Sequence, residues 1–191
     1  ARMGIPKESF QILVEPKLLP LFQIQDRSVR LQLLLELPKM AFTGKHLEES
    51  IVPELCSGFT DSHPSIRENT LKALQTVQVS EQAVEKKLIP NFVKLLRDSE
   101  ATIRTSAILG IAKLSSRLGY EKQLDVMNAC IVAGLRDSFA PAKLAALAMI
   151  KSLGLGSQRA VADCVKLFVP LVAILFMDNN PDVRQLAFET M

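Results

Sequence analysis

The chain has 191 residues, a formal net charge of +3 and 48% hydrophobic residues. This apolar fraction is enough for a substantial buried core, and the 23% of charged residues is ordinary for a globular protein. Aromatic residues make up only 5%, so aliphatic side chains must form most of the core. The mild charge does not by itself indicate a nucleic-acid or anionic-membrane partner.

The cysteines and histidines argue against two common kinds of site. Cys56, Cys130 and Cys164 are widely spaced, no C-x-x-C pair occurs, and the two histidines are isolated. A disulfide framework or a zinc site is therefore not expected. Each cysteine lies in an apolar helical stretch, which predicts buried, reduced thiols in a reducing intracellular compartment.

The two ends of the sequence bear on targeting. Residues 1–6 lack the apolar core of a signal peptide, and the longest apolar run, 167–177, is too short to span a bilayer. We therefore expect no membrane span. The sequence does not begin with Met and stops within a helical pattern, so we interpret it as a fragment of a longer protein.

The first helix pair is predicted over residues 10–43. Pro16 and Pro20 lie four residues apart, so the first helix should be kinked or begin late. The segment from Asp26 to Arg30 is interpreted as a shortened turn, and a leucine-rich second helix follows it.

The second and third helix pairs are predicted over residues 46–79 and 81–119. In their first helices, apolar residues recur at helical spacing. These residues are Ile51, Leu55 and Phe59 in one pair, and Val84, Leu88 and Phe92 in the other. Gly119 is predicted to end the third pair at a helix C-cap.

The fourth helix pair, predicted over residues 121–156, departs from the pattern. Ala129 stands where other copies have a proline, and Lys143 stands where they have an arginine, although Asp137 is retained. The fifth pair, 158–191, returns to the pattern.

Three copies share one frame, in which a proline precedes an arginine by 14 residues and an aspartate precedes it by 6. The copies are Pro53, Asp61 and Arg67; Pro90, Asp98 and Arg104; and Pro170, Asp178 and Arg184. With Arg30 and Lys143 included, the basic residues of successive turns are 37, 37, 39 and 41 residues apart, a period typical of HEAT repeats. We therefore predict an all-α fold, a HEAT-repeat α-solenoid of about five helix pairs that forms a single domain over residues 1–191.

The repeated turn residues are predicted to form a structural ladder. An aspartate in the turn can accept hydrogen bonds from the free N–H groups of the next helix, and an arginine can reach an aspartate of its own or of an adjacent repeat. The ladder residues are Asp61, Arg67, Asp98, Arg104, Asp137, Lys143, Asp178 and Arg184.

No motif in the sequence indicates catalytic chemistry. The sequence contains neither G-x-x-x-x-G-K-[ST] nor G-x-G-x-x-G, the glycine-rich loops that bind phosphates. His46 and His63 have no partner acid or nucleophile in the sequence, which predicts a surface or capping role. We expect a protein that is not an enzyme and that has no catalytic residue, cofactor or metal.

One charge feature could support binding. Between Arg104 and Lys166 there are nine Lys or Arg residues and four acidic residues. Such an excess could form a basic stripe that attracts RNA phosphates or an acidic protein surface. No aromatic residues are interleaved, so base stacking is not indicated, and scattered solvated lysines are the alternative. The candidate contacts are Lys113, Arg117, Lys122, Arg136, Lys151 and Arg159.

Two turns resemble the central HEAT segment of the Scyl (Scy-like) pseudokinase family. One is Gly58–Lys72, and the other is Gly134–Lys143 with its R-D-x-F-A-P-x-[KR] pattern. The similarity covers about residues 18–191. It implies a longer protein with an N-terminal kinase-like domain, HEAT repeats and a variable tail. This chain would be the middle part, and it carries no H-R-D, D-F-G or V-A-I-K motif.

The resemblance implies a catalytically weak or inactive scaffold in coatomer-dependent Golgi-to-endoplasmic-reticulum traffic and, in some members, in nuclear tRNA export. The coatomer-binding signal of that family is a basic motif at the extreme C-terminus, which this sequence lacks. We expect protein partners from the coatomer and trafficking machinery, with homo-oligomerisation also plausible. The alternatives are tRNA binding through the basic stripe and a HEAT scaffold of an unrelated assembly. The expected location is the cytoplasm, at Golgi or ER–Golgi membranes or the nuclear periphery.

Overall fold

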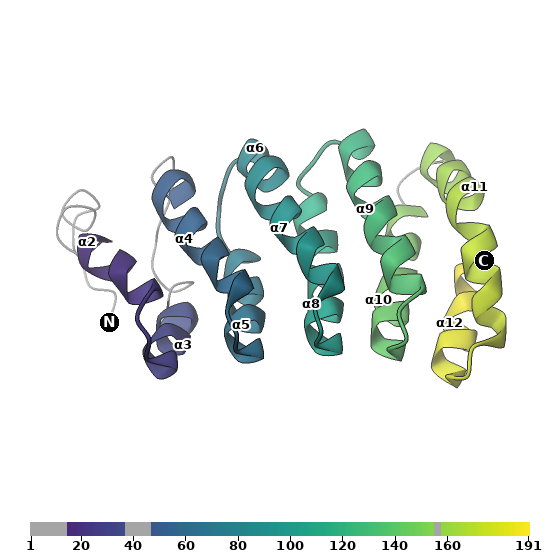
Figure 1. Ribbon diagram of the computed structural model, residues 1–191. Helices are drawn as coiled ribbons and strands as arrows, with labels where there is room; N and C mark the ends of the chain where they lie inside the picture. The colour runs from purple at the N-terminus through teal and green to yellow at the C-terminus, as the bar shows by residue number, and fades with distance from the viewer. Residues whose placement is uncertain (1–14, 37–46, 155–157) are drawn as a thin grey trace. The chain divides into compact units, whose positions relative to one another are not determined.

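A computed structural model describes residues 15–36, 47–154 and 158–191, and all regular structure in these ranges is helical. The chain divides into two compact units, Ala1–Ser80 and Glu81–Met191, which we call unit 1 and unit 2. The division falls between the second and third predicted helix pairs. Figure 1 shows the helices that make up each unit.

Unit 1 contains two helix pairs in its described residues. The first is α2 with α3, the second is α4 with α5, and α5 packs against both α3 and α4. The chain changes from α to 3-10 geometry at Leu19, next to Pro20, which has no N–H group for an α-helical bond. The bounds are α2 Glu15–Leu18, α3 Arg27–Glu36, α4 Val52–Ser57 and α5 Pro64–Leu74, with 3-10 turns at Leu19–Phe22 and Gly58–Thr60.

Unit 2 contains three helix pairs in the part that the structure describes. They are α7 with α8, α9 with α10, and α11 with α12; α8 packs against α7 and α9, and α10 packs against α9, α11 and α12. The short helix α6 leads into the first pair. The bounds are α6 Glu81–Ala83, α7 Ile89–Lys94, α8 Ala101–Ser115, α9 Tyr120–Leu135, α10 Ala140–Gly154, α11 Gln158–Ile174 and α12 Pro181–Thr190.

The prolines of the repeat frame lie in the first helix of their pairs. Proline has no N–H group, and its ring clashes with the carbonyl group one turn earlier. A π-helical turn precedes Pro53 at Leu47–Ile51, and another precedes Pro90 at Val84–Leu88. Pro170 instead lies within the continuous helix α11. The fold therefore accommodates the same repeated residue in two ways.

In two helix pairs, a glycine near the end of the first helix lies very close to a side chain of the second helix. A Cβ atom added at Gly58 would lie 2.3 Å from Thr70 Oγ1, and one added at Gly134 would lie 2.7 Å from Ala146 Cβ. Glycine is needed at both places because a side chain would overlap the second helix. The same two positions carry a leucine and an alanine in the other pairs of unit 2, namely Leu95 with Ala107 and Leu175 with Ala187, and all four are buried.

Asp26 is not the turn aspartate of the first pair, so the shortened turn predicted there is wrong. Its carbonyl group accepts from the N–H of Arg30, and its Oδ1 accepts from the N–H of Ser28 at 2.8 Å. These are the bonds of a residue at the start of a helix. The position six residues before Arg30, where other turns have the aspartate, is occupied by Ile24.

The prediction for Gly119 is also wrong. Helix α8 ends at Ser115, and Gly119 stands immediately before α9 with a φ of −61°. That backbone conformation is open to any residue, so the position does not need glycine.

The predictions for the cysteines hold in part. Cys130 is buried, and burial raises the pKa of its thiol to about 12. Cys56 is only half-buried. His46 and the side chains of Cys164 and Arg159 lie outside the described residues.

Candidate interaction surfaces

The turn aspartates hold their own turns in a fixed shape. Asp61 Oδ1 accepts from the N–H of His63, two residues further on, at 2.8 Å. Because His63 stands just before helix α5, the bond closes the turn and does not reach the N–H groups of the helix itself. The prediction is wrong in that detail. The same bond recurs at Asp98, Asp137 and Asp178, with distances of 2.9 Å.

An arginine holds the turn from the other side. Its Nη1 donates to the backbone carbonyl oxygen six residues earlier, which anchors the second helix of the pair to the turn that precedes it. The bonds run from Arg67 to Asp61 at 2.8 Å, from Arg104 to Asp98 at 2.9 Å, and from Arg184 to Asp178 at 2.7 Å. In the first pair Arg30 makes the equivalent bond to Ile24.

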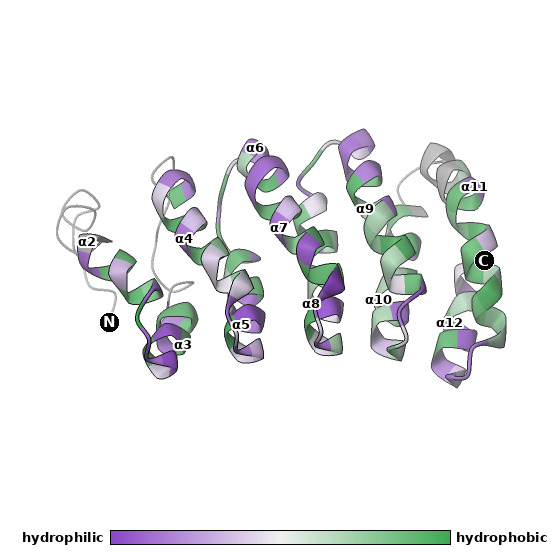
Figure 2. Ribbon diagram, in the orientation of Figure 1, coloured by the Kyte–Doolittle hydropathy of each residue, from purple (hydrophilic) through white to green (hydrophobic). Residues whose placement is uncertain are grey.

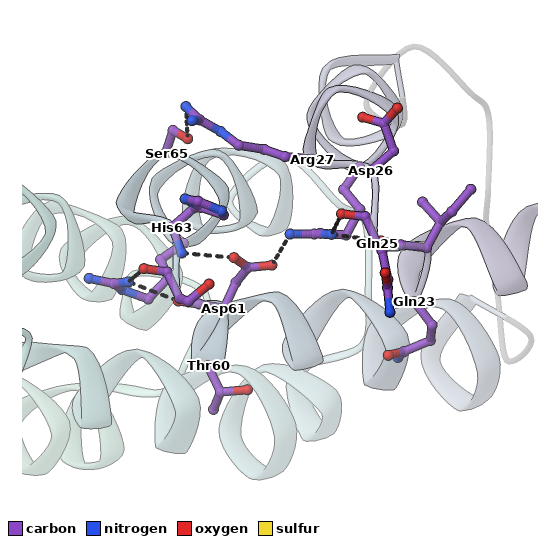
Figure 3. Close-up of polar contacts among 12 residues, drawn as sticks. Gln23, Gln25, Asp26, Arg27, Thr60, Asp61, His63 and Ser65 are labelled. Atoms are coloured by element: carbon purple, nitrogen blue, oxygen red, sulfur yellow. Dashed lines mark hydrogen bonds and ion pairs between the residues drawn. The ribbon is translucent and has the colours of Figure 1, made fainter.

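Ion pairs join neighbouring helix pairs within each unit, and we call each of them a rung. In unit 1, Arg30 Nη2 lies 2.8 Å from Asp61 Oδ2. Figure 3 labels Asp61 and marks its polar contacts with dashed lines. In unit 2, Arg104 Nε and Nη2 both donate to the carboxylate of Asp137, at 2.7 and 2.8 Å. The repeated aspartates and arginines of the turns therefore make contacts between neighbouring turns within each unit.

The rungs of unit 2 shift the pKa values of their members. Hydrogen bonds from Arg104 lower the pKa of Asp137, and the same bonds raise the pKa of Arg104. Lys143 Nζ binds Asp178 Oδ2, and this bond lowers the pKa of Asp178. Both carboxylates are mostly buried, and the hydrogen bonds from their basic partners outweigh the cost of that burial for the charged form. The assignment of these residues to structure and not to binding stays a prediction.

The residues of the predicted basic stripe differ in their surroundings. Lys122 on α9 lies 2.7 Å from Glu85, which raises the pKa of Lys122, and Lys151 on α10 lies 3.5 Å from Glu189. These two cations therefore already have carboxylate partners. Of the other candidates with described side chains, Lys113 and Arg136 are exposed and Arg117 is half-buried.

One side of α11 and of the 3-10 turn Leu175–Met177 is both apolar and exposed. The exposed fractions are 40% for Leu167, 70% for Ile174 and 87% for Met177. Their spacing of seven and three residues puts them on one side of the helix. We call these three residues the α11 apolar face, and Figure 2 shows this part of α11 mostly in the colours of hydrophobic residues.

Matching positions in the second and third pairs are polar. Four residues before the turn aspartate, where α11 has Ile174, these pairs have Ser57 and Lys94, and the fourth pair has the small Ala133. One residue before the aspartate, where the turn after α11 has Met177, the second, third and fourth pairs have Thr60, Arg97 and Arg136. The apolar run 167–177 by itself predicts only that the segment is too short for a membrane span, so it does not reveal this face. A position-by-position comparison of the repeats contains the signal.

Within the described ranges, no group of three or more His, Cys, Asp and Glu side chains is placed to hold a metal ion. None of the described helices combines the length and the apolar character needed to cross a membrane.

The sequence matches the family of non-SMC mitotic condensation complex subunit 1, Cnd1, over residues 29–138, more than half of its length. The chain belongs to this family. The part that matches Cnd1 begins one residue before Arg30 and ends one residue after Asp137, so it contains the first rung of each unit. No curated protein sequence matches the chain.

Solved structures share the fold of this Cnd1-family chain. A crystal structure of Cex1p is 24% identical with a TM-score of 0.80; the match covers 97% of this chain and 35% of that one, so this chain spans about a third of its length. The N-terminal domain of MAST/Orbit is 20% identical with a TM-score of 0.62, and the match covers 91% of this chain and 76% of that one. A designed armadillo repeat protein in complex with the peptide (KR)4 is 16% identical (TM-score 0.63; 96% and 85% covered).

These likenesses confirm the predicted fold class, an all-α solenoid of HEAT or armadillo type. Folds of this type generally bind protein partners along their repeats. The resemblance to the Scy-like family is not addressed by the matches, and it stays a prediction.

Proposed function

We propose that this Cnd1-family chain is a non-catalytic scaffold that binds a protein partner on the α11 apolar face. The observation that carries the proposal is the exposure of Ile174 and Met177, at 70% and 87%. Lys94 and Arg97 occupy the matching positions of the third pair, so the repeat does not require apolar residues there. Contiguous exposed apolar side chains mark surfaces that another protein covers, because contact with water is unfavourable for them.

A double variant tests this proposal. Ile174→Ser with Met177→Thr gives α11 the residues that the second pair has at the same positions, Ser57 and Thr60. With the chain as bait in cells, we expect recovery of the direct partner to fall by about tenfold or more, as for loss of two central interface side chains. If the partner is a second copy of the chain, the variant should instead lower the mass measured by light scattering.

The matched control is Leu109→Ser, which removes a side chain on α8 that is 51% exposed. This variant should leave partner recovery unchanged. Equal recovery of every partner by the original chain and the α11 double variant would overturn the proposal.

For the assembly, we propose a Scy-like scaffold in coatomer-dependent Golgi-to-ER traffic, located in the cytoplasm at ER–Golgi membranes. Its support is the resemblance of the turns Gly58–Lys72 and Gly134–Lys143. The family match supports a second candidate, a subunit of a mitotic condensation complex. Purified coatomer and a purified mitotic condensation complex, each offered to the immobilised chain, separate the two candidates. Binding of neither would contradict both assignments and leave only the general scaffold role.

The basic residues favour another candidate, a tRNA-binding adaptor for nuclear export. The segment from Arg104 to Lys166 contains nine basic residues and only four acidic ones. Binding of this kind should weaken steeply with salt. At a fixed salt concentration, Lys113→Ala with Arg136→Ala should weaken tRNA binding relative to the original chain. Lys94→Ala, which lies outside the segment, should leave tRNA binding unchanged. Absence of tRNA binding at low salt would eliminate this candidate.

A further inference from the structure

Helix α12 of unit 2 exposes a large apolar side chain at a position that the other second helices of this unit bury. Phe188 follows the turn residue Arg184 by four residues and is 62% exposed. Ile108 on α8 and Leu147 on α10 follow the basic residues of their own turns by the same four residues, and they are 1% and 0% exposed. The repeat therefore uses this position as an interior one, and in α12 it is uncovered.

Within unit 2, the helix pair that follows covers this position. Helix α8 packs against α9 and α10, and α10 packs against α11 and α12. A Cβ atom added at Gly134 of α9 would lie 3.0 Å from Ile108 Cδ1, so the side chain of Ile108 reaches the backbone of the following pair. The natural cover for such a position is thus another helix pair.

A second aromatic ring holds Phe188 in place. Phe176, in the 3-10 turn Leu175–Met177, stacks on it with ring centroids 4.2 Å apart and an angle of 5° between the rings. Phe176 is half-buried, so the stack anchors the exposed ring to the turn of its own pair. One face of the Phe188 ring is covered in this way, and the rest of the ring is left for contact with another molecule.

Arg184 has two donor atoms that its counterpart uses for a rung. Its Nη1 donates to the carbonyl oxygens of Asp178 and Asn179, at 2.7 and 3.1 Å. Its Nε and Nη2 have no acceptor among the described residues, and neither atom is fully buried. In Arg104 the same two atoms bind the carboxylate of Asp137, in the turn of the following pair. Arg184 can therefore form a rung with a carboxylate that approaches from outside.

Arg184 and Phe188 are four residues apart and lie on one side of α12. We call these two residues and Phe176 the α12 end face. An apolar surface beside an open guanidinium group complements an apolar helix pair whose turn carries a carboxylate, because the guanidinium fork matches a carboxylate. The first pair of a second copy lacks this group, since Ile24 stands at the position of the turn aspartate.

We propose that the α12 end face binds a helix pair of a protein partner, in which a turn aspartate pairs with Arg184 as Asp137 pairs with Arg104. That a protein partner supplies the helix pair rests on the proposed scaffold function. The surface is a different one, because the positions that match Ile174 and Met177 are exposed in the third pair, whereas the position that matches Phe188 is buried there.

The test uses nuclear magnetic resonance of the whole 191-residue chain, labelled to follow the Arg184 Nε–H signal. The probe is a synthetic peptide of residues 120–154, the fourth helix pair, because its Asp137 already makes such a rung within the chain. We expect the peptide to shift the signal saturably. The same peptide with Asp137→Asn should bind about tenfold more weakly, since a hydrogen bond to a charged group is lost.

Two variants of the chain locate the binding. Phe188→Ser should weaken peptide binding by about tenfold or more, as for a central aromatic contact. Gln185→Ala is the matched control, because Gln185 is also exposed on α12 but does not belong to the end face. This variant should leave peptide binding unchanged.

A second measurement applies if circular dichroism shows that the free peptide is not helical. Residues 112–154 are then appended after Met191, which keeps the repeat in register because Met191 matches Ile111. Docking of the appended pair should slow hydrogen exchange of the α12 amides by about tenfold or more. The slowing should be smaller when the appended copy carries Asp137→Asn.

The proposal would be overturned by a helical peptide that does not shift the Arg184 signal, or by equal binding of the Asp137→Asn peptide. Unchanged α12 exchange in the extended chain would also overturn it. So would self-association of the chain that Phe188→Ser abolishes in light scattering, because the occupant would then be a second copy. The variant Ile174→Ser with Met177→Thr should keep the peptide response, so failures of the two surfaces are distinguishable.

Discussion

Unit 1 and unit 2 are built from the same repeat, but their departures from it lie in different places. In unit 2 the rung between Arg104 and Asp137 is closed by two hydrogen bonds, of 2.7 and 2.8 Å. In unit 1 the rung between Arg30 and Asp61 uses one N–H group, and Arg30 Nε is left unpartnered beside a cavity. Unit 2 departs on its outside, where Met177 is exposed. The spacing of the turn residues is thus retained in both units, while the contacts of single residues such as Arg30 and Met177 differ.

Gly58 and Gly134 show how the interiors differ. Both stand three residues before a turn aspartate. Around Gly134, an added Cβ would meet Ala146 Cβ at 2.7 Å and Ile108 Cδ1 at 3.0 Å, whereas the three atoms nearest to an added Cβ at Gly58 all belong to Thr70. In unit 2, a side chain from the preceding pair therefore covers the glycine, and in unit 1 the corresponding region holds the cavity.

The largest expected effect comes from removing the carboxylate of the closed rung. Asp137→Ala removes the carboxylate that accepts from Nε and Nη2 of the mostly buried Arg104, so we expect unit 2 to lose about 3 kcal/mol of unfolding free energy. Asp61→Ala in unit 1 removes a rung with a single bond and should cost about 1–2 kcal/mol. Hydrogen exchange of the amides of each unit, followed through urea unfolding, measures both losses. Equal losses would show that the two rungs do not differ in strength.

A smaller effect is expected from filling space beside Thr70. Gly58→Ala should destabilise unit 1 by about 1–3 kcal/mol, because its Cβ would lie 2.3 Å from Thr70 Oγ1. Gly58→Ala combined with Thr70→Ala should recover most of the loss, so the two changes should be strongly non-additive. Thermal unfolding of the single and double variants measures this coupling. Additive effects would contradict the close approach.

The next prediction concerns acid. The pKa values of Asp137 and Asp178 are lowered in the folded state by their basic partners, so their contribution to stability is present above the unfolded pKa of about 3.9. That contribution is lost as the pH falls through the lower folded values. We expect unit 2 of Asp137→Asn to lose stability less steeply than the original below about pH 4. Unfolding curves at several pH values measure the slopes, and identical slopes would contradict the assignment.

The smallest effect is expected at an exposed ion pair. Lys122 lies 2.7 Å from Glu85, but both side chains are reached by water, which screens their attraction. Lys122→Ala should therefore leave the melting temperature of the chain unchanged. A clear decrease would mean that exposed pairs, and not only the buried rungs, hold unit 2 together.

The helix pairs were predictable from sequence because their turns use specific chemistry. A turn aspartate such as Asp61 bonds the N–H two residues later, and an arginine such as Arg67 bonds the aspartate's own carbonyl group. Those bonds demand fixed residue types at fixed spacing, so the spacing is visible in the sequence. The prediction for Asp26 is wrong because an aspartate is also favoured just before a helix. The sequence alone does not distinguish an aspartate in that position from an aspartate of the repeated turn.

The single-bond rung between Arg30 and Asp61 and the cavity beside it were not predictable in this way. Arg30 and Asp61 are the same residue types as Arg104 and Asp137, and whether one or two N–H groups reach the carboxylate depends on how neighbouring turns sit. The α11 apolar face needed a different comparison, because single apolar residues on a surface are ordinary. Only their place in the repeat, where Thr60 and Arg97 are polar, distinguishes Met177.

Photo-crosslinking can show whether the partner binds on the α11 apolar face. One photoreactive amino acid is placed in turn at Met177, Thr60 and Arg97, which occupy the same position in three pairs. After illumination in cells, crosslinked partners are identified by mass spectrometry. We expect a specific protein crosslink from Met177 and none of comparable yield from Thr60 or Arg97. Equal yields from all three positions, or no crosslink from Met177, would contradict it.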